Sequence, residues 1–226
     1  MSKLALLIGL VVGNIGNCLG LSEYNSTVWQ KDPVDGKAMP GFASPMLADL
    51  RTWQMEGWRV FIWGAGDRPS EHVISWFARR CAQITYVDWD QKWINQLQQF
   101  VNSLKLTNVK FYCHEIERLE VERKVFGRMA VNTFSDYGEK TTYVHSIAQA
   151  GIKYDLIIID GHHRNTCTIK ALDWIKPGGR IILNDANQKT MGIDSIRAYQ
   201  ALSAYPHFSF LHPGDWDWRT DYWVIQ

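Results

Sequence analysis

The sequence predicts a doubly wound α/β fold, in which helices cover both faces of a mostly parallel sheet. Short apolar runs recur along the chain, and stretches with helical spacing of apolar residues alternate with them. Strands that are buried on both faces and joined by helices are typical of parallel sheets. The strand-like runs are residues 59–63, 83–88, 108–112, 154–159 and 179–183, and the helical stretches are 70–80, 90–104, 165–175 and 194–204.

The individual residues justify these elements. The strand-like runs are rich in β-branched and aromatic side chains, which favour strands. In the helical stretches apolar residues recur three or four positions apart, which places them on one side of a helix. The inward-facing residues that we expect are Val73, Ile74 and Phe77 in the first helix, and Trp93, Leu97, Phe100, Val101 and Leu104 in the second.

We assign the domain to residues 44–226. Ser44 can cap a helix and Pro45 suits its first position, so a helix begins here, with Met46, Leu47, Leu50 and Trp53 on its apolar face. A polar, turn-rich lead-in at 21–43 precedes this helix, and strand-like runs at 207–211 and 222–225 end the chain. The polar region 117–150 fits the pattern worst; it is either a lid or substrate loop, or a surface elaboration.

The composition narrows the function classes. Of the 226 residues, 24 are Lys or Arg and 23 are Asp or Glu, a formal net charge of +1. So small a net charge gives nucleic acid no general electrostatic attraction, and we expect no nucleic-acid partner. The spacing of the cysteines predicts neither a zinc site nor a disulfide framework. Those cysteines are Cys18, Cys81, Cys113 and Cys167.

Residues 1–20 are interpreted as a signal peptide or membrane anchor. One cation, the apolar run at 4–12 and small residues up to Gly20 fit such a segment. The alternative is a buried helix or strand that caps the fold. The compartment therefore stays open between export or membrane attachment through these residues and the cytoplasm.

A glycine-rich turn follows the first strand. Gly64, Ala65 and Gly66 lie between this strand and a helix, where backbone N–H groups can face a ligand. Asp88 ends the next strand and can accept both ribose hydroxyls of an adenosine cofactor. Pro69 stands where the dinucleotide fingerprint has its third glycine, which disfavours NAD.

These residues, with those that follow them in the chain, resemble the class I S-adenosylmethionine (SAM)-dependent methyltransferases. The resemblance runs from about residue 40 to the C-terminus and implies a seven-stranded, Rossmann-like sheet with an antiparallel last strand. The order and spacing of the pieces are more specific than any one of them. The pieces are 60–66 (VFIWGAG), 86–88 (YVD), 154–161 (YDLIIIDG), 176–185 (KPGGRIILND) and the closing 219–225 (RTDYWVI).

The resemblance implies roles for individual residues. Gly64 and Gly66 would lie against the methionine part of SAM, and Asp88 would hold the ribose. At the adenine, His114 and Glu115 are candidates for the ring edge, and Trp89 either stacks on the ring or is simple packing. Asp160, at the end of the fourth strand, would face the sulfonium and the acceptor.

One position departs from the family pattern. The family usually has an acid two residues before the first glycine, and this chain has Ile62 there. Asp67 and Arg68 are candidates to substitute, with Arg68 pairing with the methionine carboxylate. The departure also leaves room for a non-catalytic domain.

The acceptor side offers a base and a metal as alternatives. An oxygen acceptor usually needs deprotonation, and His162 and His163 are either the base or loop residues that face water. Asp160 and Asp185 end two neighbouring strands and could hold Mg²⁺ together with Asn187, although the cation-dependent members have Asn directly after the second Asp, where this chain has Ala186. Arg164 either binds an anionic acceptor or lies on the surface.

The sequence thus predicts an enzyme that transfers a methyl group from SAM, most readily to an oxygen of a small molecule or sugar. Trp216, Trp218 and Trp223 either stack on such an acceptor or belong to the core. Two other functions remain open: a non-catalytic binding module with this fold, supported by Ile62, and a nucleotide-dependent oxidoreductase, opposed by Pro69. A membrane partner is expected only through residues 1–20.

Overall fold

A computed structural model describes residues 42, 44–64, 69–114, 116, 121–125, 128–132, 140–186, 195–212 and 215–226. The predicted leader at 1–20 lies outside these residues, as does the lead-in at 21–43 apart from Phe42. The assignment of the domain to 44–226 therefore stays a prediction at its N-terminal boundary. No helix in the described part of the chain is long and apolar enough to cross a membrane.

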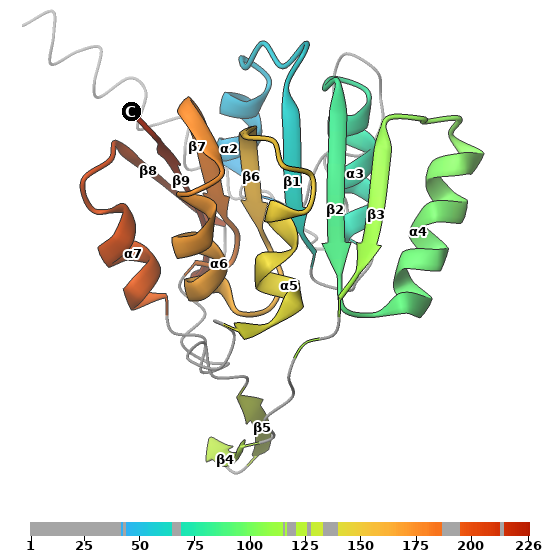
Figure 1. Ribbon diagram of the computed structural model, residues 1–226. Coiled ribbons are helices and arrows are strands. Elements are labelled where there is room, and N and C mark those ends of the chain that lie inside the picture. Colours follow the sequence, from blue (N-terminus) through green and yellow to red (C-terminus); the bar gives the residue numbers. More distant parts are fainter. Residues whose placement is uncertain are drawn as a thin grey trace, which may run out of the picture.

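Seven strands form one sheet in the order β3-β2-β1-β6-β7-β9-β8 (Figure 1). All neighbouring pairs from β3 to β7 are parallel, and β9 runs antiparallel to both β7 and β8. The predicted mostly parallel sheet with an antiparallel last strand is confirmed. The strands are β1 (Arg59–Trp63), β2 (Gln83–Asp88), β3 (Val109–Cys113), β6 (Tyr154–Ile159), β7 (Ile175–Leu183), β8 (His207–His212) and β9 (Asp215–Val224).

Helices cover both faces of this sheet. Alternate residues of each strand point to opposite faces, so two apolar clusters flank the sheet. Ile62 and Ile158 belong to the cluster under α2, α3 and α4, whereas Trp63 and Ile159 belong to the cluster under α5, α6 and α7. These helices are α2 (Ser44–Leu50), α3 (Pro69–Ala78), α4 (Gln91–Ser103), α5 (Thr142–His145), α6 (Arg164–Ala171) and α7 (Ile196–Leu202).

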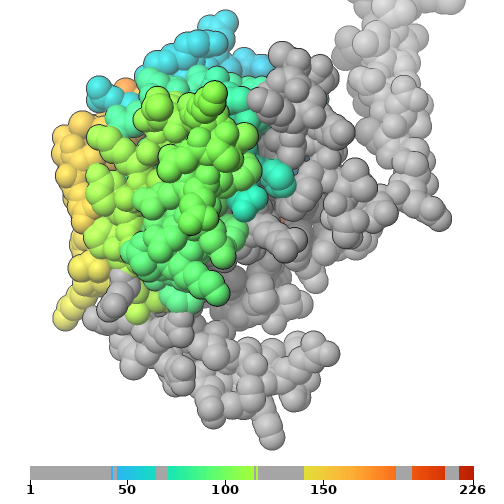
Figure 2. Space-filling model, turned by 90° about the vertical axis from the view of Figure 1, so that its right-hand side faces the viewer, coloured from blue at the N-terminus to red at the C-terminus, as the bar shows by residue number. Residues whose placement is uncertain are grey.

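The inward faces follow the sequence with one exception. Val73, Ile74 and Phe77 of α3 are buried. In α4, whose N-cap is Asp90, Leu97 is buried, but Leu104 is 39% exposed and its expected inward orientation is wrong. Leu104 is the C-cap residue, so the helix with its inward face ends there. Figure 2 looks onto this end of the sheet, where α4 and β3, in green, form the surface.

Strand β7 begins earlier than the predicted 179–183. Tyr154 pairs with Ile175 and Leu156 pairs with Arg180, so the residues between Ile175 and Arg180 bulge out of the ladder. Gly178 takes a φ of 79° within this bulge, a conformation that side chains with a Cβ rarely adopt. The Lys-Pro-Gly-Gly turn of the sequence is therefore a bulge inside a longer strand.

A charged group ties the amino ends of three strands together. The Asp155 carboxylate of β6 accepts a hydrogen bond from the Arg59 backbone N–H of β1 at 2.8 Å. It also pairs with the Lys176 ammonium of β7, whose Nζ lies 2.8 Å from Oδ1 and 2.9 Å from Oδ2. These contacts lie at the sheet edge opposite to the carboxyl ends, where α/β proteins bind ligands.

Helix α2 is fixed to the sheet by aromatic residues and one hydrogen bond. The Tyr222 hydroxyl of β9 donates to the Asp49 carboxylate at 2.6 Å. The Arg180 guanidinium lies 4.5 Å from the Trp53 ring and 5.3 Å from the Trp58 ring. The contacts of Tyr222, Arg180 and the two tryptophans hold the start of the domain against β7 and β9.

The region 117–150 contains a two-stranded antiparallel hairpin of β4 (Val121–Val125) and β5 (Arg128–Asn132), followed by α5 and a 3₁₀ turn at Ser146–Ala148. In Figure 1 the hairpin lies beyond the carboxyl ends of the strands. Its use as a lid or substrate loop stays a prediction.

Candidate functional site

The site lies where the parallel strands end. The backbone N–H of Gly64, directly after β1, donates to the Val87 carbonyl of β2 at 2.8 Å. On the other side, the backbone N–H of Asp160, directly after β6, donates to the Trp63 carbonyl at 3.0 Å. The parallel ladder thus continues one residue past β1 and β6 and brings Gly64 and Asp160 to the same edge of the sheet.

Asp88 ends β2 and is fully buried. Its Oδ2 accepts a hydrogen bond of 2.7 Å from the Tyr86 hydroxyl, and its Oδ1 accepts from the backbone N–H groups of Trp89 at 2.7 Å and Asp90 at 3.3 Å. Three donors from the chain itself hold this carboxylate in place. The ribose role of Asp88 stays a prediction.

Gly64 is required by Tyr86. A Cβ on Gly64 would lie 1.8 Å from the Tyr86 hydroxyl oxygen and 2.1 Å from the ring carbon Cζ. No larger residue fits without moving the tyrosine, since real Cβ atoms do not approach within 3.0 Å. The sequence predicts that this glycine faces a ligand, which stays a prediction, and the structure adds a close neighbour within the chain, the phenol that holds Asp88.

Tyr143 joins the same edge from α5, within the region 117–150 that fits the α/β pattern worst. Its side chain is fully buried, and burial raises its pKa well above the usual value. The Tyr143 hydroxyl donates to the Gly64 carbonyl at 3.3 Å, and a Cβ on Gly161 would lie 2.1 Å from that hydroxyl oxygen. Tyr143 therefore packs the turn after β1 against the turn after β6.

His114 provides a test of whether the residues fit an adenosyl group. Its backbone N–H donates to the Asp88 carbonyl at 2.9 Å, which places the residue beside Asp88. Its Nε2 is buried, and no described residue forms a hydrogen bond with it. A buried polar atom usually has a partner, and an imidazole nitrogen can bond the nitrogen-rich edge of adenine. The residue therefore fits the adenine role that the family resemblance implies.

The two histidines after β6 lie in different environments. His163 is 4% exposed, takes a φ of 51°, and meets the Tyr143 ring at 6.3 Å between centroids. His162 is partly exposed, and its ring meets the Trp89 ring edge-on at 5.6 Å. Trp89 thus contacts a histidine of the neighbouring turn. The alternative that His163 is a loop residue facing water is wrong. The role of either histidine as a base stays a prediction.

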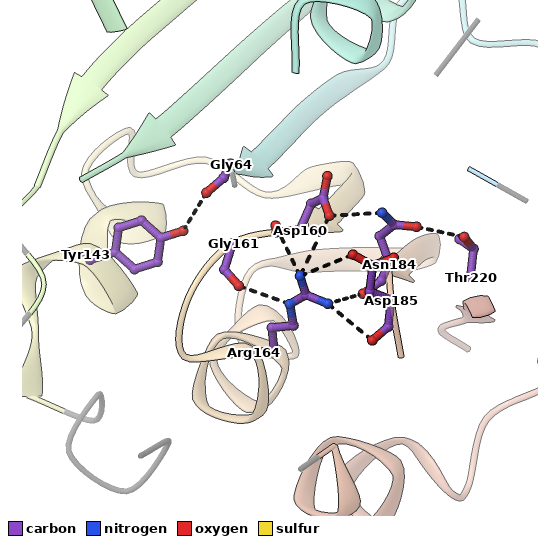
Figure 3. A network of polar contacts seen from close by, with 8 residues as sticks. All are labelled: Gly64, Tyr143, Asp160, Gly161, Arg164, Asn184, Asp185 and Thr220. Carbon is purple, nitrogen blue, oxygen red and sulfur yellow. Dashed lines mark hydrogen bonds and ion pairs between the residues drawn. The ribbon is translucent and has the colours of Figure 1, made fainter. Parts of the chain in front are cut away.

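A chain of hydrogen bonds joins the carboxyl ends of β6 and β7 to β9 (Figure 3). The Asn184 amide after β7 donates to Asp160 Oδ1 at 3.0 Å and accepts from the Thr220 hydroxyl of β9 at 2.7 Å. All three side chains are buried. Asn184 and Thr220 are not predicted as site residues from the sequence, because only the pairing of the antiparallel strand β9 with β7 brings them together.

Arg164 lies between Asp160 and Asp185. Its guanidinium donates to the backbone carbonyls of Gly161 at 3.0 Å, Asn184 at 2.5 Å and Asp185 at 3.2 Å. Its side chain is 9% exposed, so the alternative that Arg164 lies on the surface is wrong. Binding of an anionic acceptor by Arg164 stays a prediction. Figure 3 shows the guanidinium enclosed by the ends of β6 and β7.

The predicted magnesium site is not supported. The guanidinium nitrogen Nη2 of Arg164 lies 3.9 Å from Asp160 Oδ1 and 3.6 Å from Asp185 Oδ2, so a cation already lies between the two carboxylates. Within the described residues, no three metal-binding side chains form a group. The third predicted ligand, Asn187, lies outside the described residues.

Several other predicted residues cannot be placed. Ala65, Gly66, Arg68 and Glu115 lie outside the described residues, so their cofactor roles stay predictions.

Two further predicted residues lie in the core. Ile62, at the position of the family's acid, is 2% exposed in the core under α3. Trp223 is 1% exposed and belongs to the opposite core cluster.

No protein-family model matches the chain, and no curated protein matches its sequence. Solved structures do match. The fibrillarin pre-rRNA processing protein of Methanococcus jannaschii is 10% identical with a TM-score of 0.55, and the match covers 91% of this chain and 86% of that one. The precorrin 8W decarboxylase of Methanobacterium thermoautotrophicum is 13% identical with a TM-score of 0.53, and the match covers 88% of this chain and 97% of that one. A protein assigned as an O-methyltransferase in Klebsiella pneumoniae is 16% identical with a TM-score of 0.50, and the match covers 80% of this chain and 77% of that one.

These identities are low, so the matches concern the fold. The strand order, the antiparallel β9 and the likeness to these structures together define the class. The chain has the class I methyltransferase fold, as the motifs in the sequence predict.

Proposed function

We propose that this protein transfers a methyl group from SAM to an oxygen of a small-molecule acceptor such as a sugar. The observation that carries the proposal is the meeting of Gly64, Asp88, His114 and Asp160 at one edge of a sheet with this fold. Ligands of open α/β sheets bind at the carboxyl ends of the strands, which is this edge.

The strand ends supply a residue for each part of the cofactor. Gly64 would face the methionine part, Asp88 would hold the ribose hydroxyls, and His114 would bond the adenine edge through its buried Nε2. When bound, SAM supplies a methyl group that is already activated on a sulfonium. The protein then has mainly to hold the acceptor in line with it.

For an oxygen acceptor, His162 is the better placed of the two predicted bases. His162 is partly exposed, whereas His163 is 4% exposed and lies against Tyr143. A neutral imidazole can take a proton from a hydroxyl. Asp160, held by Asn184, would face the acceptor beside it.

Calorimetric titration of the full chain with SAM and with its demethylated product tests cofactor binding, with NAD as the control. We expect binding of both adenosyl ligands and none of NAD. The Asp88→Asn variant should lose at least about tenfold in affinity, since it loses charge-assisted hydrogen bonds to the ribose. The Asp155→Asn variant, changed at the opposite end of the strands, is the matched control and should keep the affinity of the wild type.

Transfer of labelled methyl from SAM to a panel of sugars, phenols and amines then tests the acceptor class. We expect the wild type to label hydroxyl compounds. The His162→Ala variant should label them at least about tenfold less. Labelling of amines alone contradicts the proposed oxygen acceptor.

A second candidate, a non-catalytic binding module, is favoured by one observation. Ile62 is buried where the family has an acid, so that contact with the SAM amino group is missing at this position. The module predicts that neither adenosyl ligand binds and that Asp160→Ala leaves the biological function intact. Binding of NAD instead would favour an oxidoreductase.

A further inference from the structure

We propose that Arg164 is a built-in cation that replaces a divalent metal between Asp160 and Asp185. The groups around its guanidinium are oxygens: the carbonyls of Gly161, Asn184 and Asp185, and the two carboxylates. Carboxylate and carbonyl oxygens are also the ligands that Mg²⁺ and Ca²⁺ prefer. In this protein the same set of ligands encloses a side chain.

The two carboxylates at this place already have a positive charge beside them, one guanidinium for two carboxylates, which leaves a net charge of −1. The side chains of Asp160 and Asp185 are 10% and 18% exposed, and that of Arg164 is 9% exposed. Two carboxylates so shielded from water need a nearby positive charge. The guanidinium of Arg164 supplies that positive charge. A divalent ion entering here would first have to displace the arginine from its carbonyl bonds.

Arg164 also fixes the shape of this edge. It is the first residue of α6, and its nitrogens bond the turn after β6 through Gly161 and the turn after β7 through Asn184 and Asp185. A bound metal would join the same two turns in the same way. The inference that transfer needs no divalent ion rests on the proposed function, whereas the inference that Arg164 fills a cation site does not.

Titration of the full chain with Mn²⁺, followed by calorimetry, tests the cation site without SAM or an acceptor. The variants Arg164→Ala and Arg164→Gln remove the charge. The matched control is Arg164→Lys, which keeps a cation at position 164. Arg197→Ala removes an exposed arginine elsewhere and serves as a second control. The glutamine variant is included because its amide can still bond part of the carbonyl set.

We expect the wild type, Arg164→Lys and Arg197→Ala to bind no Mn²⁺ at this place. The neutral variants should bind one ion with a Kd of about 10⁻⁴–10⁻³ M, as few-carboxylate sites do. Adding Asp185→Asn to either of them should weaken that binding at least about tenfold. A neutral variant that folds only when Mn²⁺ is present counts as binding.

Three results overturn the inference: Mn²⁺ binding by the wild type that Asp185→Asn abolishes, folded neutral variants that bind no ion, and neutral variants that stay unfolded in Mn²⁺. A failure of the proposed function is separate, because it appears as lost SAM binding with the Mn²⁺ pattern intact. If both proposals hold, methyl transfer by the wild type is unchanged by a metal chelator.

Discussion

Replacing Gly64 with alanine tests the contact between β1 and β2 at the centre of the site. The new Cβ would lie 1.8 Å from the Tyr86 hydroxyl oxygen, and ordinary contacts begin at 3.4 Å. The hydroxyl must therefore retreat by about 1.6 Å, which breaks its 2.7 Å hydrogen bond to Asp88. Asp88, the predicted ribose residue, therefore loses one of its hydrogen-bond donors, although the substitution is at Gly64.

The magnitude follows from two costs. Overpacking a buried site costs about 1–3 kcal/mol, and losing a hydrogen bond to a charged group costs about 1.5–3 kcal/mol. We expect Gly64→Ala to lower the free energy of unfolding by about 3–5 kcal/mol and the melting temperature by roughly 6–20 °C. Urea unfolding followed by tryptophan fluorescence measures the first quantity.

A double-mutant cycle assigns the cost to Tyr86. Tyr86→Phe should relieve little of the overpacking, because the ring carbon Cζ also lies 2.1 Å from the new Cβ. Tyr86→Val removes the ring, so most of the overpacking penalty of Gly64→Ala should disappear in that background. An equal penalty in the Tyr86→Val and wild-type backgrounds would refute the reasoning.

Three further predictions concern other parts of the molecule. Asn184→Ala should cost about 2–4 kcal/mol in urea unfolding, because it removes partners from two buried groups, and Thr220→Val should cost less; equal effects contradict the chain of hydrogen bonds. Burial raises the pKa of the Cys81 thiol from 9.0 to about 12. The unfolded chain therefore releases this proton first, and the free energy of unfolding should fall above pH 9 by up to about 1.4 kcal/mol per pH unit until pH 12; Cys81→Ala should remove that part of the slope. Tyr222→Phe should cost about 1 kcal/mol by loosening α2, and Asp49→Ala should add nothing to it in the double variant.

The sequence predicts the sheet well because its strands are buried on both faces. Runs such as that of β6 are too apolar to lie elsewhere, and the motifs order them along the chain. The predictions were poorer where tertiary contacts decide. Leu104 fits the apolar pattern of α4, but the helix ends there, and the bulge in β7 depends on pairing with β6.

The site could be predicted where position along a strand determines it. Asp88 and Asp160 lie at strand ends, which the motifs mark. Tyr86 was within reach of the same reasoning, since it precedes Asp88 by two residues and so shares its side of β2. Tyr143 and Arg164 were not, because their roles depend on how α5 and α6 pack against the strand ends.

The bonds around Asp155 stabilise the sheet at a place away from the site. Stability and activity are often in conflict in enzymes, and here they depend on opposite ends of the strands. The bonds of Asp155 align β1, β6 and β7 at their amino ends, a strand length away from Gly64 and Asp160. Substitutions that strengthen the amino ends can therefore raise thermal tolerance while the opposite ends keep their chemistry. In directed evolution, such changes would give the chain the stability to accept destabilising mutations at the opposite ends, where the proposed function places the choice of acceptor.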